Sequence, residues 1–308
     1  MSGNTPIEWV DSSWSPWEGC QKVGPGCDNC YAEGMNRWLR RGENWGSGAA
    51  RRVYGDKHWK KPGQWQKAAA KAGRTITVFP SVCDPFDNAA PEGQRARFAQ
   101  LIIDTPNLTW LLLTKRIGNA AAMLAEMFPA GVPDNVWIGA TIVDRAEMLR
   151  DAPKLKALKV RVRFWSVEPM LGDLGDIPRD LLPDWVIVGG ESGRRARPVH
   201  LAWVRALRDQ CEAAGVPLFF KQWGEWLPWV NFNDAGIDDE PESTRYRTME
   251  WRDDRWEDVG YPSWVDTADG FIDDEECVGR VGKSAAGRLL DGRLHDAYPI
   301  VPIIPIAA

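Results

Sequence analysis

Residues 136–168 read "VWIGATIVDRAEMLRDAPKLKALKVRVRFWSVE" and contain one complete strand–helix–strand unit. The two ends, 136–142 and 162–168, are short continuous apolar runs, which are typical of strands buried on both faces of a parallel sheet. Between them, Asp144 is followed three residues later by Glu147, a spacing typical of the first turn of a helix. The stretch therefore predicts two parallel strands joined by a helical crossover.

The same alternation extends over most of the chain. Six or seven such units in series predict an α/β fold around a parallel sheet. The sheet is either a partial or full TIM-like (β/α) barrel of about six to seven strands, or a doubly wound sheet. The further strand-like runs are 75–81, 109–115, 184–190 and 217–223, with 7–10 as a candidate first strand, and the further helical segments are 92–105, 117–128 and 199–215.

Polar residues directly after the predicted strands favour the barrel. In a (β/α) barrel the loops after the strands build the active site at one face, whereas a doubly wound sheet concentrates function at one switch point. The residues concerned include Asp84, Lys115, Arg116, Thr141, Glu168, Gly190, Glu191 and Lys221.

The charge is distributed unevenly along the chain. Residues 232–276 hold 16 acidic residues and four arginines, a net charge of −12, so the remainder carries +7 within a total of −5. This predicts a barrel over 1–229 and, over 230–308, an acidic insertion and C-terminal extension that pack on it. A basic body suits a polyanionic partner such as nucleic acid, although a solvated insertion on an ordinary protein explains the charge equally well.

The N-terminus "MSGNTPIEWV" lacks the basic and apolar regions of a secretory signal, and the longest apolar runs are too short to cross a bilayer. We therefore predict a cytoplasmic protein without a membrane partner. Disulfides seldom persist in a reducing compartment, so clustered cysteines there more often bind metal or carry out redox chemistry.

Three of the six cysteines lie together in "GCQKVGPGCDNCY" (19–31), at the spacing C-x6-C-x2-C of Cys20, Cys27 and Cys30. Glycines around them allow a short loop to wrap so that several sulfurs converge. Structural zinc requires four closed ligands, whereas three thiolates suit a [4Fe–4S] cluster that leaves one iron open. We favour the cluster; zinc with a distant fourth ligand and a redox dithiol remain alternatives.

A (β/α) barrel with three cysteines after its first strand resembles the radical S-adenosylmethionine (SAM) superfamily. More closely, "IEWVDSSWSPWEGCQKVGPGCDNCYA" (7–32), "WLLLTKR" (110–116), "SVEPMLGDL" (166–174), "WVIVGGESGRRARP" (185–198) and "FFKQWGEW" (219–226) are similar to a three-Cys-motif family of phage and bacterial proteins. The usual superfamily spacing is C-x3-C-x2-C, so the gap of six is a departure that weakens the expectation of SAM more than that of the cluster.

The resemblance implies a [4Fe–4S] cluster on Cys20, Cys27 and Cys30, SAM on its open iron, and reductive cleavage of SAM to a 5′-deoxyadenosyl radical that acts on substrate. It also implies an electron donor such as a flavodoxin or ferredoxin, and phage association adds to the expectation of a nucleic acid or nucleotide substrate. The residues expected to contact SAM are Tyr31, Asp84, Thr141, Glu168, Gly189, Gly190 and Glu191. No catalytic residue is predicted.

Several of these residues have two interpretations. "GGESGRRARP" (189–198) brings backbone N–H groups and the charges of Arg194, Arg195 and Arg197 to an anion, or forms a tight turn with a solvated basic face. Asp84 binds SAM or caps the next helix.

Lys115, Arg116 and Lys221 bind an anionic substrate, or form ion pairs with Glu168 and Asp84. At the level of function, the alternatives to a radical enzyme are a non-catalytic nucleic-acid-binding protein with a structural cluster or zinc, and an electron-transfer protein.

Overall fold

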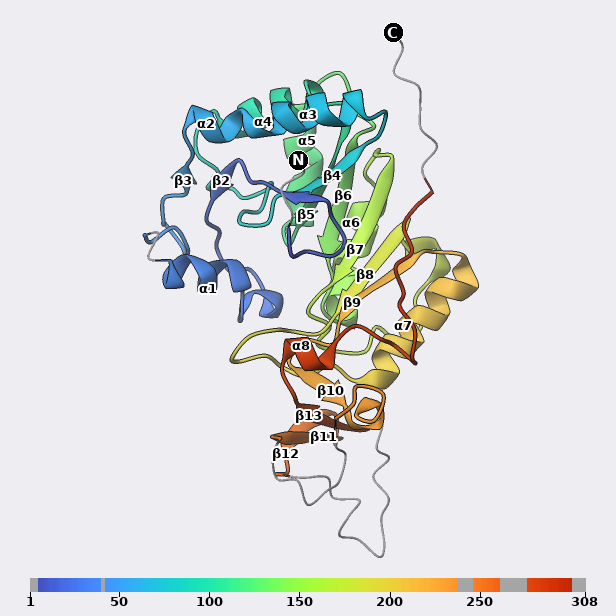
Figure 1. Cartoon of the computed structure of the whole chain (residues 1–308). Helices are drawn as coiled ribbons and strands as arrows, with labels where there is room; N and C mark the ends of the chain where they lie inside the picture. The colour runs from blue at the N-terminus through green and yellow to red at the C-terminus, as the bar shows by residue number, and fades with distance from the viewer. Residues whose placement is uncertain (1–4, 40–41, 238–245, 261–275, 301–308) are drawn as a thin grey trace, which may run out of the picture.

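The computed structural model describes residues 5–39, 42–237, 246–260 and 276–300. Seven parallel strands curl into a half-barrel in the order β1-β4-β5-β6-β7-β8-β9, which confirms the predicted partial barrel (Figure 1). The strands are β1 Ser12–Ser13, β4 Ile76–Phe79, β5 Leu108–Thr114, β6 Val136–Thr141, β7 Val162–Val167, β8 Trp185–Gly189 and β9 Leu218–Gln222.

Helices cover the convex face of the half-barrel and form the main core together with the strand residues that face them. The predicted start at Asp144 is confirmed, because its side chain accepts a hydrogen bond from the Glu147 backbone N–H at 2.8 Å. Within the described residues, no helix combines the length and apolarity needed to cross a membrane. The main helices are α3 Lys61–Lys71, α4 Gln94–Ile103, α5 Ile117–Met127, α6 Arg145–Lys156 and α7 Leu201–Ala214.

The prediction of a first strand at 7–10 is wrong. The strand that pairs with β4 is β1, at Ser12–Ser13, and the preceding segment buries Trp9 inside the half-barrel. The Trp9 ring lies 4.7 Å from Phe79 and 6.2 Å from Trp185. The apolar run of this segment therefore fills the concave interior instead of extending the sheet.

The lower part of the concave interior is a closed aromatic layer. Trp185 lies at its centre and contacts Trp137, Phe164 and Phe219 as well as Trp9. One layer higher along the strands, the inward-facing positions include Thr141, Ser166 and Lys221. The half-barrel is thus packed with aromatic rings below and lined with polar groups at the carboxyl ends of its strands, as in other barrels.

Between β1 and β4 the chain forms the elements that carry the cysteines. The two-residue strands β2 and β3 pair with each other, and α1 follows the last cysteine. In Figure 1, α1 lies apart from the layer of helices on the convex face. The bounds are β2 Trp17–Glu18, η1 Pro25–Cys27, α1 Tyr31–Trp38, β3 Arg52–Val53 and α2 Asp56–Trp59.

The C-terminal part forms a second, antiparallel sheet in the order β10-β13-β11-β12, and its chain then returns to the half-barrel. The backbone N–H of Phe220 donates to His295 O at 2.9 Å, so the returning segment borders β9. Parts of the acidic segment, 238–245 and 261–275, lie outside the described residues. The elements are β10 Trp226–Pro228, η3 Trp229–Asn231, β11 Thr248–Arg252, β12 Arg255–Asp258, β13 Cys277–Arg280 and α8 Lys283–Ala286; the short η2 Arg179–Leu181 precedes β8.

Candidate functional site

A cavity of about 350 Å³ lies at the carboxyl ends of the strands. It brings together the three clustered cysteines and most of the polar residues predicted at the strand ends. Of the predicted site residues, those that line it are Cys20, Cys27, Cys30, Tyr31, Asp84, Lys115, Arg116, Thr141, Glu168, Gly190, Glu191 and Lys221, whereas Gly189, Arg194 and Arg195 do not.

The cysteine loop, residues 20–30, closes on itself through short backbone hydrogen bonds. Cys27 N–H donates to Gly24 O at 2.9 Å, and Cys30 N–H to Cys27 O at 3.3 Å. Gly26 passes so close to the loop after β6 that a Cβ there would lie 2.8 Å from Val143 Cγ1. A side chain at residue 26 would therefore force Val143 to shift where the cysteine loop meets the loop after β6.

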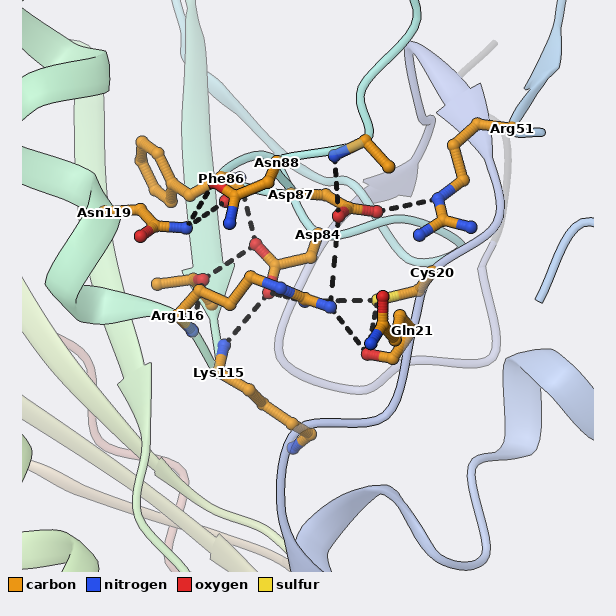
Figure 2. A network of polar contacts seen from close by, with 12 residues as sticks. Cys20, Gln21, Arg51, Asp84, Phe86, Asp87, Asn88, Lys115, Arg116 and Asn119 are labelled. Carbon is orange, nitrogen blue, oxygen red and sulfur yellow. Dashed lines mark hydrogen bonds and ion pairs between the residues drawn. The ribbon is translucent and has the colours of Figure 1, made fainter. Parts of the chain in front are cut away.

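Cys20 is held by Arg116, which follows β5 (Figure 2). The Arg116 guanidinium donates to Cys20 Sγ at 3.3 Å and to Asp84 Oδ2 at 2.9 Å, and its side chain is only 9% exposed. Burial, with a further contribution from Asp84, raises the pKa of Cys20 to about 11, although Arg116 opposes the increase. Arg116 is therefore occupied by an ion pair, and it places positive charge on one of the three candidate ligands.

Both carboxylate oxygens of Asp84 are already used by the protein. Oδ1 accepts from the Thr114 hydroxyl at 2.7 Å and from Phe86 N–H at 2.9 Å, and Oδ2 accepts from Arg116 and from Lys115 N–H. The next helix, α4, has Gly93 at its N-cap, so Asp84 does not cap it. Asp84 thus supports the wall of the cavity.

A second clamp holds the other end of the cysteine loop. Glu191, which follows β8 and is 7% exposed, accepts from Asn29 Nδ2 at 2.9 Å and from Arg197 Nη2 at 2.8 Å. Arg197 also donates to Pro25 O at 2.9 Å and pairs with Asp28 at 3.2 Å. Burial by itself would raise the pKa of Glu191, but the hydrogen bonds from Arg197 and Asn29 outweigh burial and lower it.

We expect Arg197→Met to destabilise the protein by about 2–4 kcal/mol at pH 7, because Glu191 would remain buried without its cation. In the wild type the lowered pKa contributes stability that is lost only as the pH falls through that lowered value. In the variant only the hydrogen bonds from Asn29 and from the backbone N–H of residue 197 still oppose burial, so the pKa of Glu191 rises. The loss of stability relative to the wild type therefore becomes smaller between pH 7 and about pH 5. Urea unfolding at both pH values measures the difference.

The matched control is the double variant Arg197→Met with Glu191→Gln. It has no buried carboxylate at position 191, so its loss of stability is expected to change little between the two pH values. A deficit for Arg197→Met that is equal at both pH values would contradict the electrostatic clamp.

The remaining strand-end residues have distinct environments. Lys221 forms an ion pair with Glu168, one of the two arrangements that the sequence allows. The hydroxyl of Thr141 is buried and has no hydrogen-bond partner among the described residues. Gly190 donates its N–H to Gln222 O at 2.8 Å, so this part of the glycine loop contacts the strand β9.

Of the predicted site cations, Lys115, Arg194 and Arg195 have no carboxylate partner within the described part of the chain. The ammonium of Lys115 lies over Gly26, where an added Cβ would be 3.5 Å from Nζ, and it faces the cavity. Arg194 and Arg195 are exposed on the loop after β8, which contacts the cysteine loop through a 2.7 Å hydrogen bond from Asn29 to Arg195 O. These cations border the site without being neutralised by it.

The cavity also contains residues that were not predicted as site residues, among them Asn29, Trp45, Cys83 and Lys283. Cys83 lies in the loop after β4, next to Asp84, and its position after a predicted strand could have identified it. Trp45 and Lys283 reach the cavity from a long connection and from α8, and no sequence pattern indicates their position.

The three clustered cysteines are the candidate ligands for a metal group at this cavity. Among the described residues, no three His, Cys, Asp or Glu side chains are close enough to hold one metal ion. In a three-cysteine cluster each thiolate binds a different iron, whereas structural zinc takes four convergent ligands. Three free cysteines on one loop lining one cavity meet the chemical requirement of a three-thiolate cluster, and Cys20, Cys27 and Cys30 would be its ligands.

The fold and the site define a class: α/β half-barrel proteins with a cysteine-lined cavity at the carboxyl ends of the strands. The chain belongs to the family described as a protein of unknown function (DUF5131), whose sequence model matches residues 4–299. No curated protein and no solved structure matches the chain significantly.

Proposed function

We propose that the protein is an iron–sulfur enzyme of the radical SAM type. The observation that carries this proposal is the convergence of three cysteines from one loop, and of polar residues from the ends of the six strands β4 to β9, on one cavity of a parallel half-barrel. Ligand cavities in barrels lie at this face, and about 350 Å³ is within the range of small-molecule sites. The resemblance in the cysteine and glycine-loop motifs supports the same proposal.

The chemistry that such a cluster supplies when bound is one-electron reductive cleavage of SAM, with the electron coming from a donor of the flavodoxin or ferredoxin kind. The chain itself positions the ligands. Arg116 orients Cys20, while Glu191 and Arg197 fix the segment around Asn29 against the loop after β8. Two ion pairs from different loops thus hold the two ends of the cysteine loop.

The cavity walls offer complementary groups for a zwitterionic nucleoside. The Lys115 ammonium faces the cavity, and the buried Thr141 hydroxyl has its hydrogen-bonding capacity unused within the described chain. The Tyr31 ring lines the cavity and is 54% exposed, while its hydroxyl donates to Ser81 O at 2.8 Å and fixes the ring. Below these groups, the aromatic layer around Trp185 excludes water from the floor.

The test is anaerobic reconstitution with iron and sulfide, followed by absorbance and EPR spectroscopy of the reduced protein with and without SAM. We expect about four irons per chain, a reduced-cluster EPR signal that SAM perturbs, and release of 5′-deoxyadenosine. Cys20→Ala, Cys27→Ala and Cys30→Ala should each abolish the cluster. Cys211→Ala, in the core of α7 and away from the cavity, is the matched control and should retain it.

A cluster that does not respond to SAM would reject the radical hypothesis and leave electron transfer or structural support. Stoichiometric zinc without iron, in protein kept anaerobic throughout, would reject the iron–sulfur assignment itself. Unchanged iron content in all three cavity variants would show that the cluster is bound elsewhere.

A further inference from the structure

The mouth of the cavity continues onto an exposed aromatic face of α1. Tyr31, Gly34 and Trp38 follow the spacing i, i+3, i+7, so they share one side of the helix. Tyr31 lines the cavity at one end of this face. At the other end Trp38 is 80% exposed, and its ring contacts no other aromatic ring in the described chain.

A tryptophan this exposed is unusual in a chain that buries so many of its indoles. Gly34, between the two aromatic residues, has no atom within 4 Å of the position of an added Cβ, so the face between them is open. Seven residues of α-helix separate Tyr31 from Trp38 by about 10 Å. The face therefore offers two aromatic surfaces, one at the cavity and one outside it.

Positive charge borders this face. Arg194 and Arg195 are exposed on the neighbouring loop, and Lys283 lines the cavity from α8; none of the three has a carboxylate partner within the described ranges. The acids on the cysteine loop and on α1 have cationic partners: Asp28 pairs with Arg197, which it shares with Glu191, and Glu33 pairs with both Arg37 and Lys22. The net field at the mouth thus favours a polyanion.

We propose that α1 and the loop at Arg194 and Arg195 bind single-stranded nucleic acid across the mouth of the cavity. A base stacks on Trp38, the phosphates lie along the free cations, and the strand is thereby directed to the cavity. Aromatic stacking combined with a basic track is the mode by which proteins bind unpaired strands. A duplex keeps its bases stacked inside and cannot use Trp38. That the bound strand serves as the substrate rests on the proposed function. That the strand binds at this face does not.

Binding can be measured by fluorescence anisotropy with labelled oligothymidylate and oligouridylate of about 20 nucleotides, and with a duplex of equal length. The full chain is used anaerobically with its cysteines reduced, both with and without reconstituted iron. We expect single strands to bind at least about five-fold more tightly than the duplex, since stacking contributes only to the former. Comparison of the two oligonucleotides distinguishes DNA from RNA as the source of the strand.

Two variants separate stacking from charge. Trp38→Ala should weaken single-strand binding at least about five-fold while leaving the salt dependence unchanged. Replacing both Arg194 and Arg195 by Gln should reduce the slope of log affinity against log salt by about 1.4, because each phosphate that an arginine neutralises on a single strand contributes about 0.7 to that slope.

The matched controls are Leu149→Ala, an exposed apolar residue of α6, and Arg179→Gln, an exposed arginine of η2 before β8 and hence at the opposite end of the strands. Both should bind within about two-fold of the wild type.

Equal affinity for single strands and duplex, wild-type affinity of Trp38→Ala, or no oligonucleotide binding at low salt would each overturn the inference. The last result would instead favour a protein partner on this face. Strand binding that depends on Trp38 in a protein that assembles no cluster would reject the proposed function and retain this inference. A SAM-responsive cluster without strand binding would support the proposed function and reject this inference.

Discussion

Arg116→Met is expected to lower the free energy of unfolding by about 3–5 kcal/mol, because it removes one partner of a buried ion pair. The Asp84 side chain is 7% exposed, and its Oδ2 would keep only the 3.2 Å hydrogen bond from Lys115 N–H. Burial by itself would lower the pKa of Arg116, but Asp84 and Cys20 raise it, so the guanidinium is charged in the wild type. Urea unfolding followed by tryptophan fluorescence measures the loss.

The double variant with Asp84→Asn is the control for this prediction. It leaves no buried charge unpaired, so it should recover a large part of the stability that Arg116→Met loses, with an interaction energy of at least about 1 kcal/mol in the double-mutant cycle. A second arginine, Arg51, is fully buried against Asp87 at 2.8 Å and stays in place in both variants. Additive effects of the two substitutions would show that Arg116 and Asp84 do not stabilise each other.

The strands β4 to β9 and the helices α4 to α7 were predictable from the sequence, because these strands are short apolar runs that alternate with segments of helical period, some of which carry a boundary signal. Gly215, for example, ends α7 in the left-handed conformation, with φ of 71°. The apolar run at 7–10 was wrongly predicted to be a strand, because an apolar segment that fills a half-barrel has the same composition as a strand that extends the sheet. The strands β11 and β12 escaped prediction because they are short and rich in polar residues.

The position of the cavity was also predictable, because parallel strands bring their carboxyl ends to one face. The pairing of its side chains was not. In the sequence Arg197 is one more positive charge of a basic loop. In the structure it forms an ion pair with Glu191 and donates a hydrogen bond to the carbonyl oxygen of Pro25, which lies 172 residues away in sequence. Such pairings depend on how separate loops meet in space, and no local pattern in the sequence specifies that arrangement.

The glycine loop after β8 leads to the other large effect: Gly190→Ala is expected to cost at least about 3 kcal/mol or to prevent folding. Overpacking in a core usually costs about 1–3 kcal/mol when flexible side chains can move. At Gly190 a Cβ would lie 1.9 Å from the backbone oxygen of Trp223 and 2.7 Å from its carbonyl carbon. Backbone atoms cannot move aside without breaking the 2.8 Å hydrogen bond from Gly190 N–H to Gln222 O.

The matched control is Gly118→Ala in α5, where an added Cβ meets no atom within 4 Å and φ is not positive. Alanine stabilises a helix relative to glycine, so this variant should gain about 0.5–1 kcal/mol. The free energy of unfolding of Gly139→Ala should fall between those of the other two variants. Its Cβ would lie 2.3 Å from the Phe164 ring. This ring is packed in the aromatic layer, but as a side chain it can shift. The free energies of unfolding of the three variants, measured in urea, test this order. If Gly190→Ala were as stable as Gly118→Ala, the glycine at 190 would not be required by the approach of Trp223, and its role would lie in binding a ligand.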